Sequence, residues 1–404
     1  MKYLLTHGHL IIDGNNEYLD GALLIDGERI QEVYYQSNKV GTIDDECEVI
    51  DLKGAIVMPG FFDTHTHGID GITFDACTKE QLDKLCYEFA KDGSTSFLGS
   101  ISYDLPTNMY DQRWEVFNGY ESKWNRFEGI HIEGPFLSPK HLGVGDPEKF
   151  LKPDVNLYKD VLAKTNVLKQ VTVAYEREGA KEIGKFLHDN NVRVMVGHSD
   201  ALESDLDENV DGFTHLFNAM RGLHHRNITL VNAAFTNKYY CEVITDGNHV
   251  SENVLKLVMN NIDRNKIVIV TDSSEARGLA DGEYVSFSKH CIKKGTKYMT
   301  VDGHYAGSVV SINDEIKELR KLGAKYTDLL LWSSLNAFKL YGLDQQFGTL
   351  VKGKYADLVI MDDDLNIKNV YSKGKFIYDW VLSKTNNLFC LLCFSTIWIK
   401  CFGF

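Results

Sequence analysis

Two histidines, His65 and His67, are the residues whose types, spacing and surroundings first point to chemistry in this chain. They follow an apolar run at residues 55–58, which is typical of a buried strand. Residues two apart in a strand project to the same side, so the two imidazoles should point together. Neutral imidazole is a common ligand of divalent zinc and iron. A hydrogen-bonded pair of histidines at a strand end is the alternative, and the later histidines favour the metal.

Further acidic and imidazole side chains follow apolar runs along the chain, namely Glu133, His198, His215, His249 and Asp272. Glu133, His198 and His215 form a mixed carboxylate–imidazole set, which catalytic metal sites use when they keep a position for water. A buried salt-bridge network is the alternative for this set. His65 and His67 would complete a second site with Glu133 as the bridge. Asp272 could cap a helix, but beside a metal a proton-transferring role is favoured.

Strands alternating with helices must position these side chains. The apolar runs predict eight strands, near residues 56–65, 95–101, 128–133, 169–174, 192–198, 211–215, 240–246 and 266–272. Helical patterns occur at 78–91, 178–190, 251–261 and 312–322. This alternation favours an α/β fold, a (β/α)8 TIM barrel, over an open sheet. The candidate residues follow the strands, and chemistry in such barrels lies at the carboxyl ends of the strands.

Both ends of the chain have a different texture, with short apolar runs separated by glycine and asparagine turns. Residues 1–58 and 345–384 are therefore predicted to build one small β-sandwich domain beside a catalytic barrel at 59–344. The segment 385–404 is an anomalous apolar tail that holds three of the eight cysteines. A tail anchor, a locally packed element and an altered reading frame remain open for it.

The overall charge limits the partners of the protein. A formal net charge of −14 argues against nucleic acid or an anionic membrane as the main partner, because both reward a basic surface. The cysteines are scattered and no secretory signal precedes the first strand, which favours reduced thiols in the cytoplasm. A local cationic cluster, His224, His225 and Arg226, could still bind an anionic small molecule.

Four sequence motifs resemble the amidohydrolase superfamily and, within it, the family of N-acetylglucosamine-6-phosphate deacetylases. The resemblance extends from the first strands to about residue 380. Its motifs are PGFFDTHTHG at 59–68, HIEGPFLSPK at 131–140, THLFNAM at 214–220 and GLADGEY at 278–284. The Glu-Gly-Pro-Phe element that begins at Glu133 is far more specific to these deacetylases than the His-x-His pair.

The resemblance implies a fold, an activity and a set of site residues. The fold is a barrel with a small β-sandwich built from both chain ends. The activity is metal-dependent hydrolysis of N-acetylglucosamine 6-phosphate, with Asp272 as catalytic acid and base. One or two divalent ions, zinc or iron, are implied at Glu133, His198, His215, His65 and His67. Substrate contacts are implied at Val144, Asn218, Ala219, Arg226, His249, Ala306 and Gly307. We expect a homodimer.

Three departures from the family pattern bear on the substrate. Gly145 stands where the family often has His or Gln, so another group, such as His141, would have to hold the sugar. Ile228 and Thr229 replace Pro-Gly, and Ser273-Ser274 replaces Ala-Met. Another N-acyl sugar phosphate, such as N-acetylgalactosamine 6-phosphate, is therefore an alternative substrate. The alternative that is not an enzyme is a catalytically silent barrel that only binds a ligand or acts as a scaffold.

Overall fold

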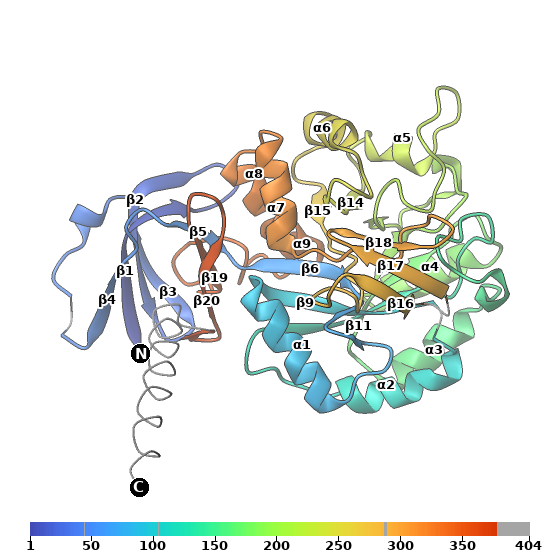
Figure 1. The fold of residues 1–404 in the computed structure, drawn as a ribbon, viewed down its shortest axis with the longest axis horizontal. Coiled ribbons are helices and arrows are strands. Elements are labelled where there is room, and N and C mark those ends of the chain that lie inside the picture. Colours follow the sequence, from blue (N-terminus) through green and yellow to red (C-terminus); the bar gives the residue numbers. More distant parts are fainter. Residues whose placement is uncertain (44, 104, 287–288, 378–404) are drawn as a thin grey trace, which may run out of the picture.

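The computed structural model describes residues 1–43, 45–103, 105–286 and 289–377. The anomalous tail and the last predicted residues of the small β domain lie outside these ranges. Figure 1 shows two parts side by side, a small β domain that contains the N-terminus and a larger domain of strands and helices. Among the described helices, none is both long and apolar enough to cross a lipid bilayer.

Eight parallel strands form the wall of the larger domain, and each pairs with the next one along the chain. They are β6 (Phe61–Thr66), β9 (Ser94–Ile101), β10 (Arg126–Glu133), β11 (Leu168–Val173), β12 (Arg193–Val196), β13 (Gly212–Phe213), β14 (Tyr240–Val243) and β15 (Ile267–Ile269). Beyond β15, a parallel bridge joins Ser273 to Thr66 of β6, and the N–H of Asp272 donates to the carbonyl of His65 over 2.8 Å. The predicted TIM-type barrel is thereby confirmed as a near-closed barrel.

The first predicted strand, near 56–65, is in fact two strands in two different sheets. β5 (Ile56–Pro59) belongs to the small β domain and β6 belongs to the barrel, with Gly60 between them. A Cβ at Gly60 would lie 2.0 Å from the Thr95 hydroxyl oxygen, so only glycine allows this close approach. The continuous apolar composition hid the change of sheet, because both strands are buried.

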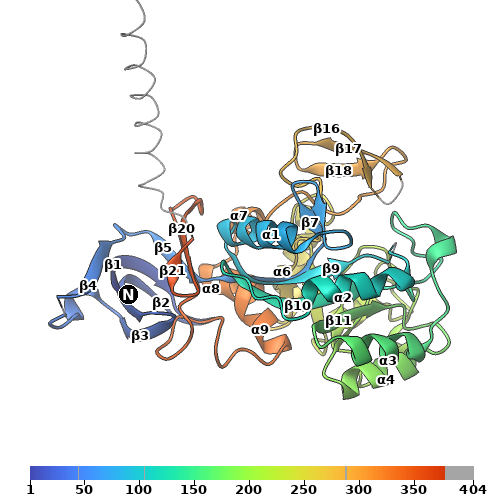
Figure 2. The same ribbon diagram turned by 90° about the horizontal axis from the view of Figure 1, so that it is seen from below.

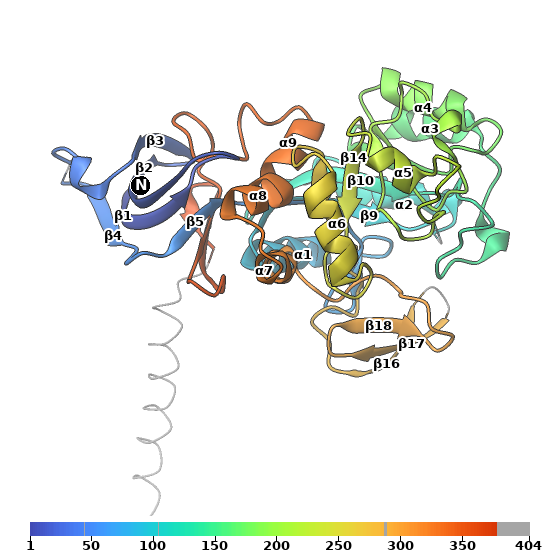
Figure 3. The same cartoon turned by 90° about the horizontal axis from the view of Figure 1, so that it is seen from above.

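Helices cover the outside of the barrel wall (Figures 1 and 3). They are α1 (Lys79–Lys91), α2 (Tyr110–Phe117), α3 (Val155–Lys164), α4 (Ala180–Asp189), α5 (Leu230–Ala234), α6 (Glu252–Asn261), α7 (Ile312–Lys321), α8 (Tyr326–Leu330) and α9 (Asn336–Leu340). All four predicted helical patterns are confirmed. In α1, for example, Leu82, Leu85, Cys86 and Phe89 are buried, the i, i+3, i+4, i+7 spacing of a helix with one apolar face.

Both ends of the chain build the small β domain, as predicted, and its strands form one mixed sheet. Its strands are β1 (Lys2–Ile11), β2 (Glu17–Asp26), β3 (Arg29–Tyr34), β4 (Cys47–Asp51), β5, β19 (Leu358–Met361), β20 (Ile367–Ser372) and β21 (Lys375–Phe376). β19 pairs antiparallel with β5, which joins the C-terminal strands to the N-terminal ones. The sheet curls around its own core, which includes Leu10, Leu23, Val57 and Leu358.

A three-stranded antiparallel sheet, which the sequence did not predict, projects from the barrel (Figures 2 and 3). Its strands are β16 (Gly282–Ser286), β17 (Lys289–Lys294) and β18 (Lys297–Thr300). A separate short hairpin, β7 (Gly68–Ile69) and β8 (Ile72–Thr73), follows β6. The buried ammonium of Lys293 donates to the carbonyls of Ala276 and Leu279, over 3.0 and 2.5 Å. These bonds fix the small sheet to the segment that follows β15.

Candidate active site

The residues predicted to do chemistry lie together at the carboxyl ends of the barrel strands. His65 and His67 lie at the end of β6, and Glu133 is the last residue of β10. His198, His215 and Asp272 follow β12, β13 and β15, each with a positive φ, 46°, 29° and 46° respectively. Such a backbone conformation is uncommon outside glycine, and it tends to mark functional positions that the surrounding fold enforces.

Glu133, His198 and His215 form one compact buried group of potential metal ligands. Oε1 of Glu133 lies 3.1 Å from Nε2 of His215 and 3.2 Å from Nε2 of His198, and the two nitrogens are 3.2 Å apart. Two ligands of a tetrahedral zinc ion with bonds of about 2.0–2.1 Å are separated by about 3.3 Å. The three atoms therefore have the spacing that one shared cation requires.

His65, His67 and Glu133 form a second buried group. The two Nε2 atoms are 3.1 Å apart, and that of His67 lies 3.4 Å from Oε2 of Glu133. The Nε2 atom of His65 is 3.8 Å from Oε1 of the same carboxylate. Because Glu133 belongs to both groups, the arrangement suggests a binuclear site of the kind that a bridging carboxylate holds.

The electrostatics of these residues fit divalent cations. Burial alone would raise the pKa of Glu133, but hydrogen bonds from His198, His215 and His67 hold it well below its ordinary value. Burial opposes a charge on His67, yet the hydrogen bond to Glu133 and the charges of Glu133 and Asp272 raise its pKa to about 9. In the metal-free protein, the proton on His67 thus balances the negative charge of Glu133 and Asp272. A bound divalent cation would balance the same two carboxylates.

The tautomer of His198 is also suited to metal binding. Its Nδ1 atom lies 3.0 Å from the carbonyl oxygen of His141, which only accepts, so Nδ1 carries the proton and donates. The lone pair of neutral His198 is then on Nε2, the atom that faces Glu133. A backbone carbonyl in this role is a common support for metal-binding histidines.

Asp272 lies between the second group and the open part of the site. Its Oδ1 atom is 3.4 Å from Nε2 of both His65 and His67. Burial raises the pKa of Asp272, the charge of His67 lowers it and that of Glu133 raises it, with a net increase. A carboxylate with a raised pKa beside potential metal ligands is placed to accept and return a proton.

A cavity of about 200 Å³ opens above the two groups. Glu133, His67, His198, His215 and Asp272 line it on the side of the potential metal ligands, whereas His65 lies buried beneath. Six of the predicted substrate residues also line it, namely Val144, Asn218, Ala219, His249, Ala306 and Gly307. Arg226 does not; it is exposed, and its Nε donates to Nε2 of His225 over 2.8 Å.

His249 is held firmly at the cavity wall. Its Nδ1 atom lies 2.8 Å from Oδ2 of Asp246, and its backbone N–H donates to Oδ1 of the same carboxylate over 2.8 Å. The ring lies 4.5 Å from that of Tyr305, another lining residue. Because the acceptor-only carboxylate fixes the proton on Nδ1, the Nε2 atom is left for a ligand.

The space that a side chain at Gly145 would need is already filled. A Cβ there would lie 2.8 Å from both the carbonyl oxygen of Leu142 and the ring of Phe150, and 3.0 Å from the ring of Tyr103. Tyr103 lines the cavity. His141, suggested from the sequence as a replacement, lies 3.1 Å from the Asp200 carboxylate and is not among the lining residues.

Sequence reasoning missed several lining residues: Tyr103, Ser274, Glu275, His304 and Tyr305. Tyr103 comes two residues after β9, so the rule that chemistry follows the strands could have found it. His304 and Tyr305 follow β18 of the projecting sheet, and no barrel strand points to them. Ser274, noted as a departure from the family, donates its hydroxyl to the carbonyl of Ser308 over 3.1 Å, so this donor is already used.

Comparison with known proteins agrees with this geometry. Residues 56–377 match the model of the amidohydrolase family. An N-acetylglucosamine-6-phosphate deacetylase of Bacillus subtilis is 29% identical, covering 89% of this chain and 96% of its own. An N-acetylgalactosamine-6-phosphate deacetylase of Escherichia coli O157:H7 is also 29% identical, covering 81% and 89%.

A solved structure gives the same picture. A mutant N-acetyl-D-glucosamine-6-phosphate deacetylase of Mycobacterium smegmatis, in complex with N-acetyl-D-glucosamine-6-phosphate, superposes with a TM-score of 0.82 at 25% identity, covering 93% of this chain and 99% of that one. The matched residues contain the whole barrel and every candidate metal ligand. The chain is therefore an amidohydrolase, a member of the amidohydrolase family.

Proposed function

We propose that the protein hydrolyses the N-acetyl group of N-acetylglucosamine 6-phosphate and releases acetate and glucosamine 6-phosphate. The observation that carries the proposal is the cavity itself. It joins the two groups of potential metal ligands and Asp272 to a wall formed by Asn218, Ala219 and His249. A hexosamine phosphate needs such a site, with reactive groups at the amide and hydrogen-bond donors at the phosphate.

The roles of the residues follow from their places. Glu133, His198 and His215 would hold one divalent ion, and His65 and His67 would share Glu133 around a second. Bound there, zinc or iron would acidify water and polarise the acetyl carbonyl. Asp272 would take the proton of the attacking water and return it to the leaving amine.

Phosphate recognition is assigned first to His249, because it lines the cavity and Asp246 fixes its ring. Val144, Asn218, Ala219, Ala306 and Gly307 would contact the rest of the sugar phosphate. Arg226 could reach the same phosphate only if the exposed segment 221–228 moved or if a second subunit supplied it. The homodimer and the cytoplasmic location stay predictions.

N-acetylgalactosamine 6-phosphate is the second candidate substrate, because relatives named for either epimer are equally identical to this chain. Acetate release should be measured on both 6-phosphates and on both unphosphorylated sugars. The proposal expects the highest kcat/KM on N-acetylglucosamine 6-phosphate. A higher kcat/KM on N-acetylgalactosamine 6-phosphate would make that sugar the assigned substrate. Binding of either sugar phosphate without acetate release would favour the catalytically silent barrel.

A further inference from the structure

A buried carboxyl lies beneath the second group of potential metal ligands, on the side away from the cavity. Glu242, on β14, is completely buried. Its Oε1 atom accepts hydrogen bonds from the Thr64 hydroxyl over 2.7 Å and from the Gln170 amide over 3.0 Å. Its Oε2 atom has no hydrogen-bond partner among the described residues. A buried acceptor without a partner is costly and calls for an explanation.

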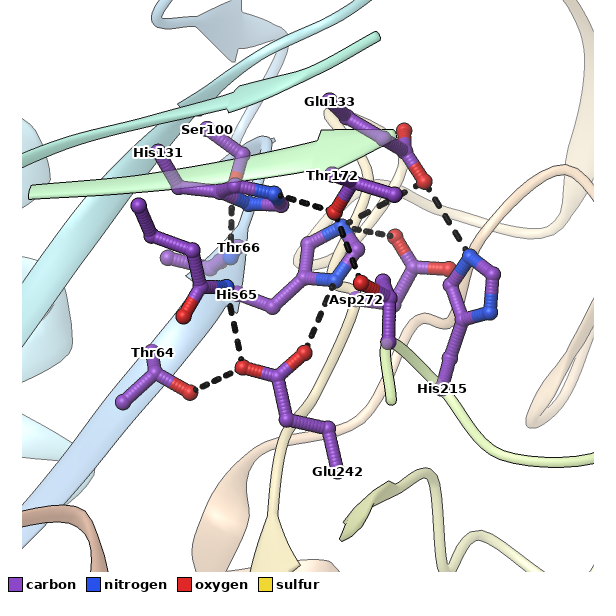
Figure 4. A network of polar contacts seen from close by, with 12 residues as sticks. Thr64, His65, Thr66, Ser100, His131, Glu133, Thr172, His215, Glu242 and Asp272 are labelled. Carbon is purple, nitrogen blue, oxygen red and sulfur yellow. Dashed lines mark hydrogen bonds and ion pairs between the residues drawn. The ribbon is translucent and has the colours of Figure 1, made fainter. Parts of the chain in front are cut away.

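The nearest explanation is the ring of His65. The Nδ1 atom of His65 also lacks a hydrogen-bond partner in the described part of the chain, and it lies 4.0 Å from Oε2 of Glu242. Figure 4 shows the His65 ring between Glu242 on one side and Glu133 with Asp272 on the other. Two unpartnered polar atoms therefore face each other, about 1 Å beyond the usual hydrogen-bond distance of about 2.7–3.2 Å.

His131, which packs against the ring of His65, does not compete for the contact with Glu242. His131 lies with its ring centre 4.6 Å from that of His65. Its Nδ1 atom is 3.0 Å from the Ser100 hydroxyl and its Nε2 atom is 2.8 Å from the Thr172 hydroxyl. Both ring nitrogens of His131 are thus occupied, and Figure 4 shows the contact with Thr172.

We propose that Glu242 is a positioning residue for His65, an inference that rests on the metal site of the proposed function. When Nε2 of His65 binds a cation, its remaining proton must be on Nδ1, and Oε2 of Glu242 is the acceptor that faces it. A carboxylate in this role fixes the tautomer and orientation of a metal-binding histidine and increases its basicity. Because His198 is held by a backbone carbonyl instead, Glu242 supports only the His65–His67 ion.

Glu242→Gln tests this inference with little change in volume. Its amide would either donate to Nδ1, which forces the proton onto Nε2, or offer a weaker neutral acceptor. Zinc binding to the metal-free protein should be titrated in competition with a chromophoric chelator, which measures the affinity of each of the two ions separately. We expect the second ion to bind 10- to 100-fold more weakly, while the first stays within about threefold.

Glu315→Gln is the matched control. Glu315 is also a completely buried carboxyl with one unpartnered oxygen, but its other oxygen accepts the N–H of Thr245. This substitution should leave both zinc affinities unchanged. Equal affinities in Glu242→Gln and wild type, or equal losses in the two variants, would overturn the inference.

A crystal structure of the zinc-loaded wild-type protein provides a test that does not depend on the folding of any variant. The distance from Nδ1 of His65 to Oε2 of Glu242 should shorten from 4.0 Å to hydrogen-bond length. A separation still near 4 Å would contradict the inference. These tests measure zinc affinity and an interatomic distance rather than catalysis. Absence of deacetylase activity would therefore contradict the proposed function and not this inference.

Discussion

Oε2 of Glu133 lies 3.4 Å from Nε2 of His67, while Oε1 of the same carboxylate faces the other group of histidines. One side chain at the end of β10 thus links histidines from β6 with those that follow β12 and β13. The link explains how two ions could share a site that lies within a single barrel mouth. It also makes the two ions separable by mutation, because each has its own histidines.

Replacing both His65 and His67 with Asn should lower bound zinc from about two ions to about one per subunit, since Glu133, His198 and His215 remain. Elemental analysis of protein reloaded with zinc and passed through a desalting column measures the ratio. His131→Asn serves as control, because the ring of this buried histidine is hydrogen-bonded to the hydroxyls of Ser100 and Thr172. A ratio that does not change in the double variant would leave the pair a structural role.

Asp272→Asn should keep the metal and the fold but lose most turnover. Removal of a positioned proton-transfer group typically lowers the rate by about 10²- to 10⁴-fold. Steady-state kcat, compared at equal zinc content, is the measurement. Turnover within a few-fold of wild type would contradict the assignment of Asp272 as acid and base.

His249→Ala should raise KM for the 6-phosphate roughly 10- to 100-fold, because a hydrogen bond to a charged group contributes about 1.5–3 kcal/mol. Activity on the unphosphorylated sugar should barely change, since that substrate never makes the contact. Arg226→Ala gives the comparison for an exposed cation outside the cavity. Equal losses of the His249 variant on both sugars would mean that His249 supports structure only.

Glu315 should make folding stability depend on pH. Burial raises its pKa well above the ordinary value of 4.5, so the folded state holds the proton more tightly than the unfolded state. Stability is therefore lost as pH rises from about 4.5 towards the folded pKa, by up to about 1.4 kcal/mol per pH unit. In urea unfolding of metal-free protein between pH 5 and 8, Glu315→Gln should lack this contribution. A free-energy difference from wild type that stays constant with pH would contradict it.

The positions of the candidate catalytic residues could be predicted because, in a barrel, such residues follow the strands, and the strands recur along the sequence as apolar runs. Glu133, His198 and His215 each follow an apolar run, and the fold brings such ends together. The change of sheet at Gly60 could not be predicted, because the strands on both sides of it are buried and apolar. Glu242 is a further signal that the sequence contains, a carboxylate between the apolar residues Cys241 and Val243 of the strand predicted at 240–246.

The cavity walls were harder to predict than its floor. His304 and Tyr305 reach the site only through the projecting sheet, whose short strands carry lysines at exposed positions and at one buried position, Lys293. Arg226 follows His215 along the chain, but it is exposed and does not line the cavity, so its predicted contact with the substrate stays a prediction. Nearness along the chain does not give the direction of a loop.

The central claim is that this barrel removes an acetyl group with the help of divalent metal, and acetate release from N-acetylglucosamine 6-phosphate tests it most directly. The protein should be stripped with a chelator, assayed, reloaded with zinc or with ferrous iron under anaerobic conditions, and assayed again. Acetate and glucosamine 6-phosphate should appear in equal amounts, disappear on stripping and return on reloading, while Asp272→Asn stays low throughout. Equal acetate release with and without metal, or none from either N-acetylhexosamine 6-phosphate after reloading, would contradict the account.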